Sequence, residues 1–565
     1  MKKSIILVFL VCLISAQIYA TKSDYKITEQ SILEHIAVLA SDSLEGRQVG
    51  EPGELKAAEY IRNVYKSIGL ESHNLDNYFQ YYDFIKEIKI TENNSLVVNE
   101  MALTLNEDFI PLKQSKSTQF NFDGYVDVDY GIKVSDDSGS YNDYADKNVE
   151  GKLVLIKRFA PDAGSNPHVD FDKYSSLADK MQTAIEEKAS GIIFYTPEDH
   201  DDTLIDYGVT NIYTKDIPIF FVKQRGMEKI RNASVPIKIS GNTELLVIRD
   251  TAQNVVGYLP GETDSTVIIG AHYDHLGYGG PTSLWTGAPA IHNGADDNAS
   301  GVSALLELAK KYAKSSEKFH FSMIFIAFSG EEAGLLGSNK YAKHMTVDSS
   351  KVRMMINMDM IGRLKDQDNG LAILGVGTTD EFKSFFDSLK FQDMILSLKE
   401  SGTGPSDHTI FYNRNIPVLH LFTGAHSDYH KPSDDIEKID ANGIVKVSAL
   451  VDSVITYFDN YDKPLVFSKT KDSTEGKRRS KYSVSLGVMP DYVAEVQGLK
   501  IDGVTEDRPA DKAGMLPGDI VVQLGDNVIN DIYDYMGALA KFRKGDTVKA
   551  VVNRNGEMLE MSVTF

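Results

Sequence analysis

The chain has 565 residues, of which 42% are hydrophobic and 25% charged, and its formal net charge is −22. At roughly 100–200 residues per domain, this length predicts about three to five domains with sizeable cores. The acidic charge argues against a nucleic-acid partner, because nucleic acids are bound by basic patches.

The first 20 residues, MKKSIILVFLVCLISAQIYA, are typical of a secretory signal peptide. Two lysines precede an apolar run that is too short to span a bilayer, and Ala20 is a suitable cleavage end. A membrane anchor and a lipoprotein attached through Cys12 are the alternatives. No later segment is apolar enough to span a membrane. We therefore expect export to a bacterial periplasm or to the medium, with no membrane span after cleavage.

Cys12 is the only cysteine, so a cleaved chain would contain none. Disulfides and thiolate chemistry are then excluded, and any metal must be held by His, Asp or Glu.

Residues 21–109 are expected to form the first part of a catalytic domain. Within them, GELKAAEYIRNVYKSIGL has apolar residues at three- and four-residue spacing, which predicts a helix. Gly69 would end this helix as a C-cap.

The sequence pattern changes over residues 110–250, where short β-like runs surround one amphipathic helix. This region is interpreted as a separate, β-rich domain. Over residues 251–465, apolar runs of strand length alternate with helices, which predicts an α/β fold with a mainly parallel central sheet flanked by helices. Residues 466–483 are polar and charged and are interpreted as a linker. Residues 484–565 form a last compact unit of short strands and a helix.

Polar side chains follow the expected strands of the α/β region, where open α/β sheets bind ligands. The residues are His272, Asp274, Glu331, Glu332, Asp359 and His430, with Asp296 and Asp297 ahead of a helix. Each has an ordinary structural explanation: the aspartates before the helix could be caps, and the paired glutamates a solvated turn. Together, however, so many carboxylates would repel one another strongly unless cations neutralised them.

Two histidines and several carboxylates, without thiolate, suit zinc, with manganese or cobalt as alternatives. The acids are too many for one zinc ion. Two ions that share one carboxylate would give more of these acids a ligand position.

Five strings occur in one order: HYD at 272–274, GADDNASG, SGEEAGLLGS, NMDMIG and YHKPSD. This combination resembles the M28 family of zinc aminopeptidases and carboxypeptidases. The earlier LASDSLEGRQVGEPGELKAAEYI, residues 39–61, is similar to the N-terminal segment of that family.

The resemblance implies that His272 and Asp359 bind one zinc ion and that Glu332 and His430 bind the other. Asp296 would bridge the two ions, and the peptide bond from Asp296 to Asp297 would be cis. Asp274 would orient the His272 ring from outside the ligand set, and Asp297 would also lie in that outer set.

The implied chemistry is peptide hydrolysis. The two ions lower the pKa of a bridging water, and Glu331 accepts its proton and passes it to the leaving amine. Tyr429 stands where some family members stabilise the oxyanion.

Other histidines of the region compete for these roles: His275, His292, His408, His420 and His426. His426 is the nearest rival of His430, four residues away, although the string YHKPSD favours His430. His408 could line the substrate pocket.

The accessory regions carry resemblances of their own. NVEGKLVLIKR, AIEEKASGIIFY and IPIFFV resemble a protease-associated (PA) domain inserted into the peptidase domain, which would be a lid, a selector of substrates or a spacer. GLKIDGVTEDRPADKAGMLPGDIVVQLGDNVI resembles a PDZ domain, a β-barrel-like fold. Such domains often capture a C-terminal carboxylate by strand addition, and residues 498–501 are the candidate segment. A domain that only docks on its own peptidase is the alternative.

The sequence therefore predicts an exported two-zinc exopeptidase, an aminopeptidase acting on peptides. A carboxypeptidase or dipeptidase of the same family is the alternative within the enzyme class. A binding protein built on an inactive peptidase scaffold is the alternative outside it.

Overall fold

The computed structural model describes residues 24–565 apart from 137–138, 162–170, 175, 199, 201, 204–214, 281, 390–393, 462, 471–483, 491–495, 505–507, 530–531, 540 and 543–544. The expected signal peptide and most of the expected linker lie outside the described residues.

The catalytic region is built on an eight-stranded sheet with the order β1-β13-β15-β14-β16-β19-β17-β18. The four strands at its centre, β15, β14, β16 and β19, pair in parallel, whereas β1, β13 and β17 pair antiparallel to their inner neighbours. The predicted α/β class is thus confirmed, with a mixed sheet around a parallel centre. The strands are β1 (Phe79–Ile90), β13 (Leu245–Leu259), β14 (Thr266–His272), β15 (Ser322–Phe328), β16 (Val352–Met358), β17 (Gly370–Leu374), β18 (Ile395–Lys399) and β19 (Val418–Phe422).

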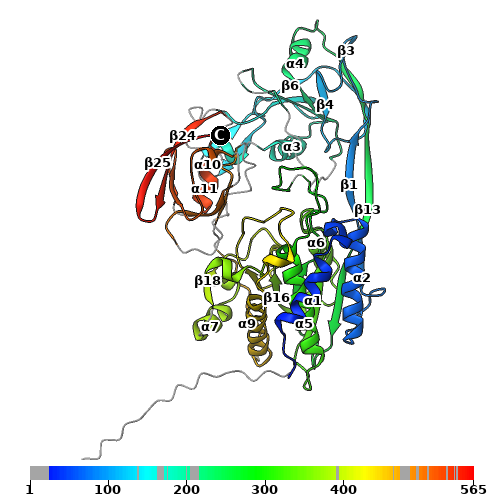
Figure 1. Cartoon of the computed structure of the whole chain (residues 1–565). Helices are drawn as coiled ribbons and strands as arrows, with labels where there is room; N and C mark the ends of the chain where they lie inside the picture. The colour runs from blue at the N-terminus through cyan, green and yellow to red at the C-terminus, as the bar shows by residue number, and fades with distance from the viewer. Residues whose placement is uncertain are drawn as a thin grey trace, which may run out of the picture.

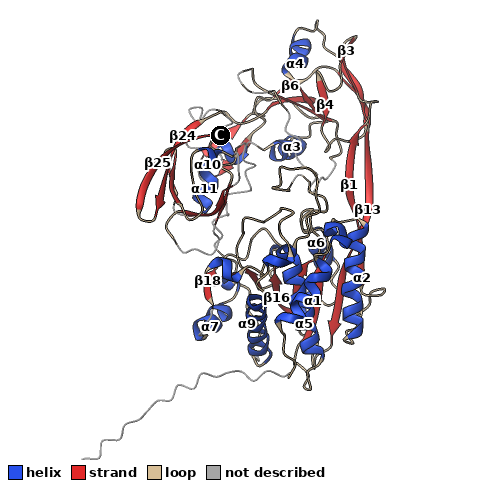
Figure 2. Cartoon of the chain, in the orientation of Figure 1, coloured by secondary structure: helices blue, strands red, loops and turns tan. Residues whose placement is uncertain are grey.

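Helices cover both faces of this sheet (Figure 2). Successive residues of β14 face opposite sides, so Ile269 packs with one cluster and Ile268 with the other, as a sheet buried on both faces requires. The first cluster includes α1 (Glu29–Leu39), α2 (Pro52–Ser67), α5 (Gly301–Ala313), α7 (Asp380–Ser388) and α9 (Ala441–Asp459), and the second includes α6 (Leu336–Lys343) and α8 (His408–Tyr412). α2 matches the helix predicted ahead of Gly69, which takes the left-handed φ of +82°.

The inserted domain leaves the sheet through a two-stranded ribbon. β1 and β13 pair antiparallel from Phe79 with Val255 to Ile90 with Leu245, and the chain between them forms the domain at the top of Figure 1. The expected boundary at residue 110 falls inside β4 (Phe109–Pro111). Two earlier strands, β2 (Ser95–Val98) and β3 (Met101–Leu103), already belong to the insertion because β2 pairs with β3 and with β12 (Ile239–Thr243).

The insertion contains a five-stranded sheet, β4-β11-β10-β9-β6, a four-stranded sheet, β3-β2-β12-β5, and the hairpin β7-β8. Its strands are β2 (Ser95–Val98), β3 (Met101–Leu103), β4 (Phe109–Pro111), β5 (Thr118–Phe122), β6 (Val126–Asp127), β7 (Lys133–Asp136), β8 (Gly139–Asn142), β9 (Leu153–Lys157), β10 (Gly191–Tyr195), β11 (Ile219–Val222) and β12 (Ile239–Thr243). Its helices are α3 (Leu177–Glu186) and α4 (Gln224–Arg231).

The C-terminal domain is a small sheet with the order β20-β21-β22-β24-β25 and its own core. Its elements are β20 (Val488–Pro490), β21 (Leu499–Val504), α10 (Pro509–Lys512), β22 (Ile520–Leu524), β23 (Asn527–Val528), α11 (Ile532–Leu539), β24 (Thr547–Arg554) and β25 (Glu557–Thr564). β21 carries part of the candidate segment 498–501: Leu499 and Lys500 pair with β22, whereas β20 pairs from Ile501 onward. The peptide-binding role of this segment stays a prediction.

No helix among the described residues combines the length and apolar character needed to cross a bilayer.

Candidate metal centre

Asp297 lies between two groups of potential metal ligands. Its Oδ1 is 3.3 Å from Nε2 of His272, and its Oδ2 is 3.3 Å from Nε2 of His430. Asp359 Oδ1 completes the first group, 3.2 Å from His272 Nε2, and Glu332 Oε2 completes the second, 3.3 Å from His430 Nε2. A carboxylate that presents one oxygen to each group can be shared by two cations.

The parallel centre of the sheet brings these residues together. His272 ends β14, Asp359 directly follows β16, and Glu331 and Glu332 follow β15 by three and four residues. β14 pairs in parallel with both β15 and β16, so the three carboxyl ends meet at one edge. The predicted residues thus meet at this edge of the sheet.

The structure exchanges the expected positions of two neighbouring aspartates. Asp296 points away from the two groups: its Oδ1 accepts the backbone N–H of Gly362 at 2.6 Å, and its Oδ2 lies 3.1 Å from His426 Nε2. Asp297 occupies the shared position expected for Asp296. The cis peptide bond lies between Asp297 and Asn298, one residue after the expected place.

His272 and His430 are each fixed through Nδ1, so that Nε2 faces the ligand groups. Nδ1 of His272 lies 3.2 Å from the backbone carbonyl of Asp274, and Nδ1 of His430 lies 2.8 Å from that of Thr282. A carbonyl only accepts, so both Nδ1 atoms carry a proton, and both Nε2 atoms face carboxylate oxygens. A second proton on Nε2 or a bound cation can satisfy these oxygens, and with Nε2 deprotonated this nitrogen and oxygen donor set fits zinc.

The adjacent glutamates differ in electrostatics. Burial, opposed by His272, raises the pKa of Glu331 well above its ordinary value. Burial also acts on Glu332, but the charge of His430 outweighs it and lowers the pKa of Glu332 to about 2. The surroundings therefore favour the ionised form of Glu332 more strongly than that of Glu331.

Asp274 orients both glutamates. Its carboxylate accepts the backbone N–H of Glu331 at 3.1 Å and that of Glu332 at 3.3 Å, and it lies 3.8 Å from His272 Nδ1. The expected contact between Asp274 and the His272 ring is made at shorter range by the Asp274 backbone carbonyl.

His275 is the closest competing histidine. Its Nδ1 lies 2.9 Å from Glu332 Oε1 and 3.8 Å from Asp297 Oδ2. His292 hydrogen-bonds through Nε2 to the Ser283 hydroxyl at 2.8 Å. Both histidines therefore adjoin the second group.

The remaining competitors are engaged elsewhere. Burial lowers the pKa of His426, but Asp296 outweighs it and raises the pKa overall, so these two residues form an ion pair. His408 is fully buried and stacks on His420 with 4.2 Å between ring centroids. Burial lowers the pKa of His420 to about 4, which leaves its ring neutral.

Tyr429 stacks on the His430 ring with 3.8 Å between centroids. Burial, reinforced by the charge of Asp297, raises the pKa of its hydroxyl well above the ordinary value. The hydroxyl therefore stays protonated near neutral pH.

Two supporting residues escaped the sequence interpretation. Asp434 accepts the backbone N–H groups of Asp296 and Asp297 at 2.9 and 3.0 Å, and Arg363 Nη2 donates to it at 3.3 Å. Buried Arg47 donates to the backbone carbonyls of Leu39, Tyr273, Asn293 and Gly294. Both lie within strings that carry the family resemblance, YHKPSDD and LEGRQVG, which was the available signal.

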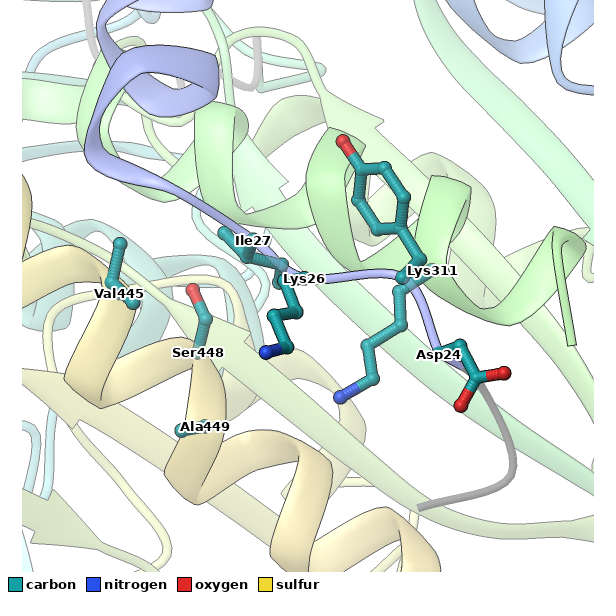
Figure 3. Close-up of a pocket in the computed structure, with 8 residues that line it drawn as sticks. Asp24, Lys26, Ile27, Lys311, Val445, Ser448 and Ala449 are labelled. Carbon is teal, nitrogen blue, oxygen red and sulfur yellow. The ribbon is translucent and has the colours of Figure 1, made fainter.

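A pocket of about 330 Å³ lies elsewhere, between the N-terminal segment, α5 and α9 (Figure 3). Lys26 and Lys311 line it, and Lys311 donates to Asp452 at 2.7 Å. Lys311 stands ten residues after the start of α5 at Gly301, or roughly 15 Å along the helix axis. The pocket is thus at the end of α5 away from Asp297.

Comparisons with known proteins agree with this architecture. Residues 254–455 match the model of peptidase family M28, residues 126–230 that of the PA domain and residues 470–565 that of a PDZ domain. A probable leucine aminopeptidase of Trichophyton verrucosum is 29% identical over 209 residues, which are 35% of this chain and 54% of that protein. The matched segment thus spans about half the length of this curated relative.

Among solved structures, an aminopeptidase from Aneurinibacillus sp. strain AM-1 superposes with a TM-score of 0.45 at 21% identity, covering 78% of this chain and 95% of that one. A zinc aminopeptidase from Bacillus subtilis superposes with a TM-score of 0.42 at 21% identity, covering 76% and 95%.

The family models thus match an M28 peptidase segment at residues 254–455, a PA segment ahead of it and a PDZ segment after it. The expected resemblance to these three families is thereby confirmed.

Proposed function

We propose that this chain is an exported exopeptidase that binds two zinc ions and acts as an aminopeptidase. The observation that carries the proposal is the Asp297 carboxylate, whose two oxygens face two separate groups of one histidine and one acid. The M28 match and the relatives named leucine aminopeptidases support the zinc and the substrate class.

In this proposal His272 and Asp359 hold one ion, Glu332 and His430 hold the other, and Asp297 is shared. His430 is preferred to His275 because its Nε2 lies 3.3 Å from both Asp297 and Glu332, with its Nδ1 bonded to Thr282. His275 makes a short contact with one oxygen of Glu332 only, as a hydrogen-bond donor that orients that ligand would.

When bound, the two ions supply Lewis acidity and make an attacking water available at neutral pH. Glu331, which holds no ligand position, accepts the proton of that water and returns it to the leaving amine. Asp274 keeps the Glu331 carboxyl in place through the backbone N–H it accepts. Tyr429 donates its hydroxyl proton in a hydrogen bond to the oxygen that becomes negative in the transition state.

Blocked peptides test the direction of attack. The zinc-loaded protein is offered one peptide with free ends, with an acetylated amine and with an amidated carboxylate. An aminopeptidase cleaves the first and the last. Cleavage of the acetylated peptide, with loss on amidation, would instead establish the carboxypeptidase alternative, and a well-folded protein holding no metal would establish the inactive scaffold.

Export and peptide capture complete the proposal. Removal of residues 1–20 would leave Thr21 as the first residue, which N-terminal sequencing of material from the periplasm or medium tests directly. In the PDZ domain the candidate segment 498–501 is the place where a peptide C-terminus would add as a strand, because among the described residues Leu499 and Lys500 pair with β22 alone. A C-terminally amidated peptide should then bind more weakly than its free acid.

A further inference from the structure

The loop from Gly277 to His292 is attached to the second ligand group. The backbone N–H of Leu284 donates to the carbonyl of His430 at 3.0 Å, while Nδ1 of His430 donates to the carbonyl of Thr282 at 2.8 Å. His430 is thus bonded to the loop through both its main chain and its ring. The residue after Leu284, Trp285, therefore stands one position from a direct partner of this histidine.

Trp285 is held rigidly although it is exposed. Its indole N–H donates to the carbonyl of Ala288 at 2.9 Å, and its backbone N–H donates to the Ser283 hydroxyl at 3.1 Å. A Cβ on Gly287 would lie 2.4 Å from the indole, so the ring lies directly against this glycine. With 47% of the residue exposed and the N–H satisfied within the loop, the exposed part of the side chain is apolar ring.

The ligand side chains themselves are carboxylates and imidazoles, which favour polar contacts with a peptide. A preformed aromatic ring on the loop that is bonded to His430 offers an apolar surface, at low entropic cost because the ring is already fixed. We propose that Trp285 is a specificity-determining residue, whose indole packs on an apolar side chain flanking the scissile bond. This inference rests on the proposed peptidase function and deepens it.

Because Trp285 is the only tryptophan of the chain, its fluorescence reports on this contact alone. The zinc-loaded Glu331→Gln variant, which binds without turnover, is titrated with Gly-Gly-Gly, Leu-Gly-Gly and Gly-Leu-Gly. We expect a blue shift with at least one leucine peptide and none with Gly-Gly-Gly. The same response to all three peptides, or no response to either leucine peptide, overturns the proposal.

Turnover gives an independent readout. Trp285→Ala should lower kcat/KM at least tenfold for the leucine peptide that gives the shift, should leave Gly-Gly-Gly nearly unchanged, and should keep its zinc content. Trp285→Phe should restore most of the loss. Leu246→Ala, at a residue with 54% exposure in the ribbon, is the matched control and should match the parent protein. An equal loss on all peptides, or none, overturns the proposal.

The two hypotheses fail differently. A parent protein that cleaves none of the peptides contradicts the peptidase function, and the titration still decides whether Trp285 contacts a peptide. A parent protein that cleaves them all, with an unchanged preference in Trp285→Ala, contradicts the role of Trp285 only.

Discussion

The carboxylate of Asp434 accepts the backbone N–H of Asp297 at 3.0 Å, and it is this bond that aims the shared carboxylate of the site. The same oxygen accepts the N–H of Asp296, so one side chain fixes two successive peptide units. Arg363 balances the charge of Asp434 from the other side. The metal groups are therefore organised in part by a side chain that binds the backbone of their shared member, Asp297.

Replacing Asp434 should disorganise the shared ligand. Asp434→Ala removes the acceptor of two buried N–H groups and a partner of buried Arg363, at a cost of about 3 kcal/mol in unfolding free energy. Zinc affinity should fall by about 10–100-fold. Denaturant unfolding and zinc titration measure both, with Asp435→Ala as the neighbouring control. Normal zinc affinity in Asp434→Ala would contradict the positioning role.

The adjacent aspartates offer a matched pair of variants. Asp297→Asn removes the charge shared by the two groups and should abolish binding of at least one zinc equivalent. Asp296→Asn breaks the ion pair with His426 and should lower stability by about 1–3 kcal/mol, with both zinc equivalents retained. Metal analysis of the two purified variants distinguishes them. Loss of zinc in Asp296→Asn alone would restore the order of roles first expected from the sequence.

Variants of the two adjacent glutamates should lose different properties of the protein. Glu331→Gln should lower kcat by a factor of at least about 100, with zinc content near that of the parent, because it loses a proton acceptor and no ligand. Glu332→Ala should lose zinc as well as activity. Turnover and zinc content are measured on the same samples. Equal zinc loss in both variants would refute the division of roles.

Glu307 predicts a pH-dependent stability outside the site. Burial opposes its charge, but His35 together with Ser31, Tyr25 and Lys310 lowers the pKa of Glu307 from 4.5 to about 2. A depressed carboxyl pKa contributes stability above pH 4.5 that is lost as the pH falls toward 2.

The Glu307→Gln variant should therefore be about 2 kcal/mol less stable near neutrality, and the difference should shrink between pH 4.5 and 2. Denaturant unfolding across this range measures it, with exposed Glu34→Gln as a control. A difference that stays constant with pH would show that the interaction is not ionic.

The site was predictable to the level of strands, because apolar runs that end in His272, Glu331 and Asp359 leave little choice of edge. The sequence could not decide between Asp296 and Asp297. A shift of one position along the chain exchanges the side chain that faces the strand ends. The local backbone at Gly294, with φ +57°, and the hydrogen bond from Asp297 to the distant Asp434 set this position.

Long-range contacts account for the other differences between the sequence-based expectations and the structure. Arg47 reaches carbonyls more than 200 residues away, which no local pattern reveals. In the PDZ domain, the family resemblance placed a loop and strand at residues 498–501, and β21 begins at Leu499. Which residues of β21 pair with β20 and which with β22 depends on the whole sheet and not on the segment itself.

The ribbon of β1 and β13 has a consequence for how the chain assembles during synthesis. β1 emerges more than 150 residues before β13, the only strand of the described fold with which it pairs. Paired strands lie about 4.8 Å apart, so the two ends of the inserted domain must come within that distance before the sheet can close. Once folded, the PA domain holds the two ends of the insertion close together. It thereby brings β1, which is synthesised early, next to β13, which is synthesised late.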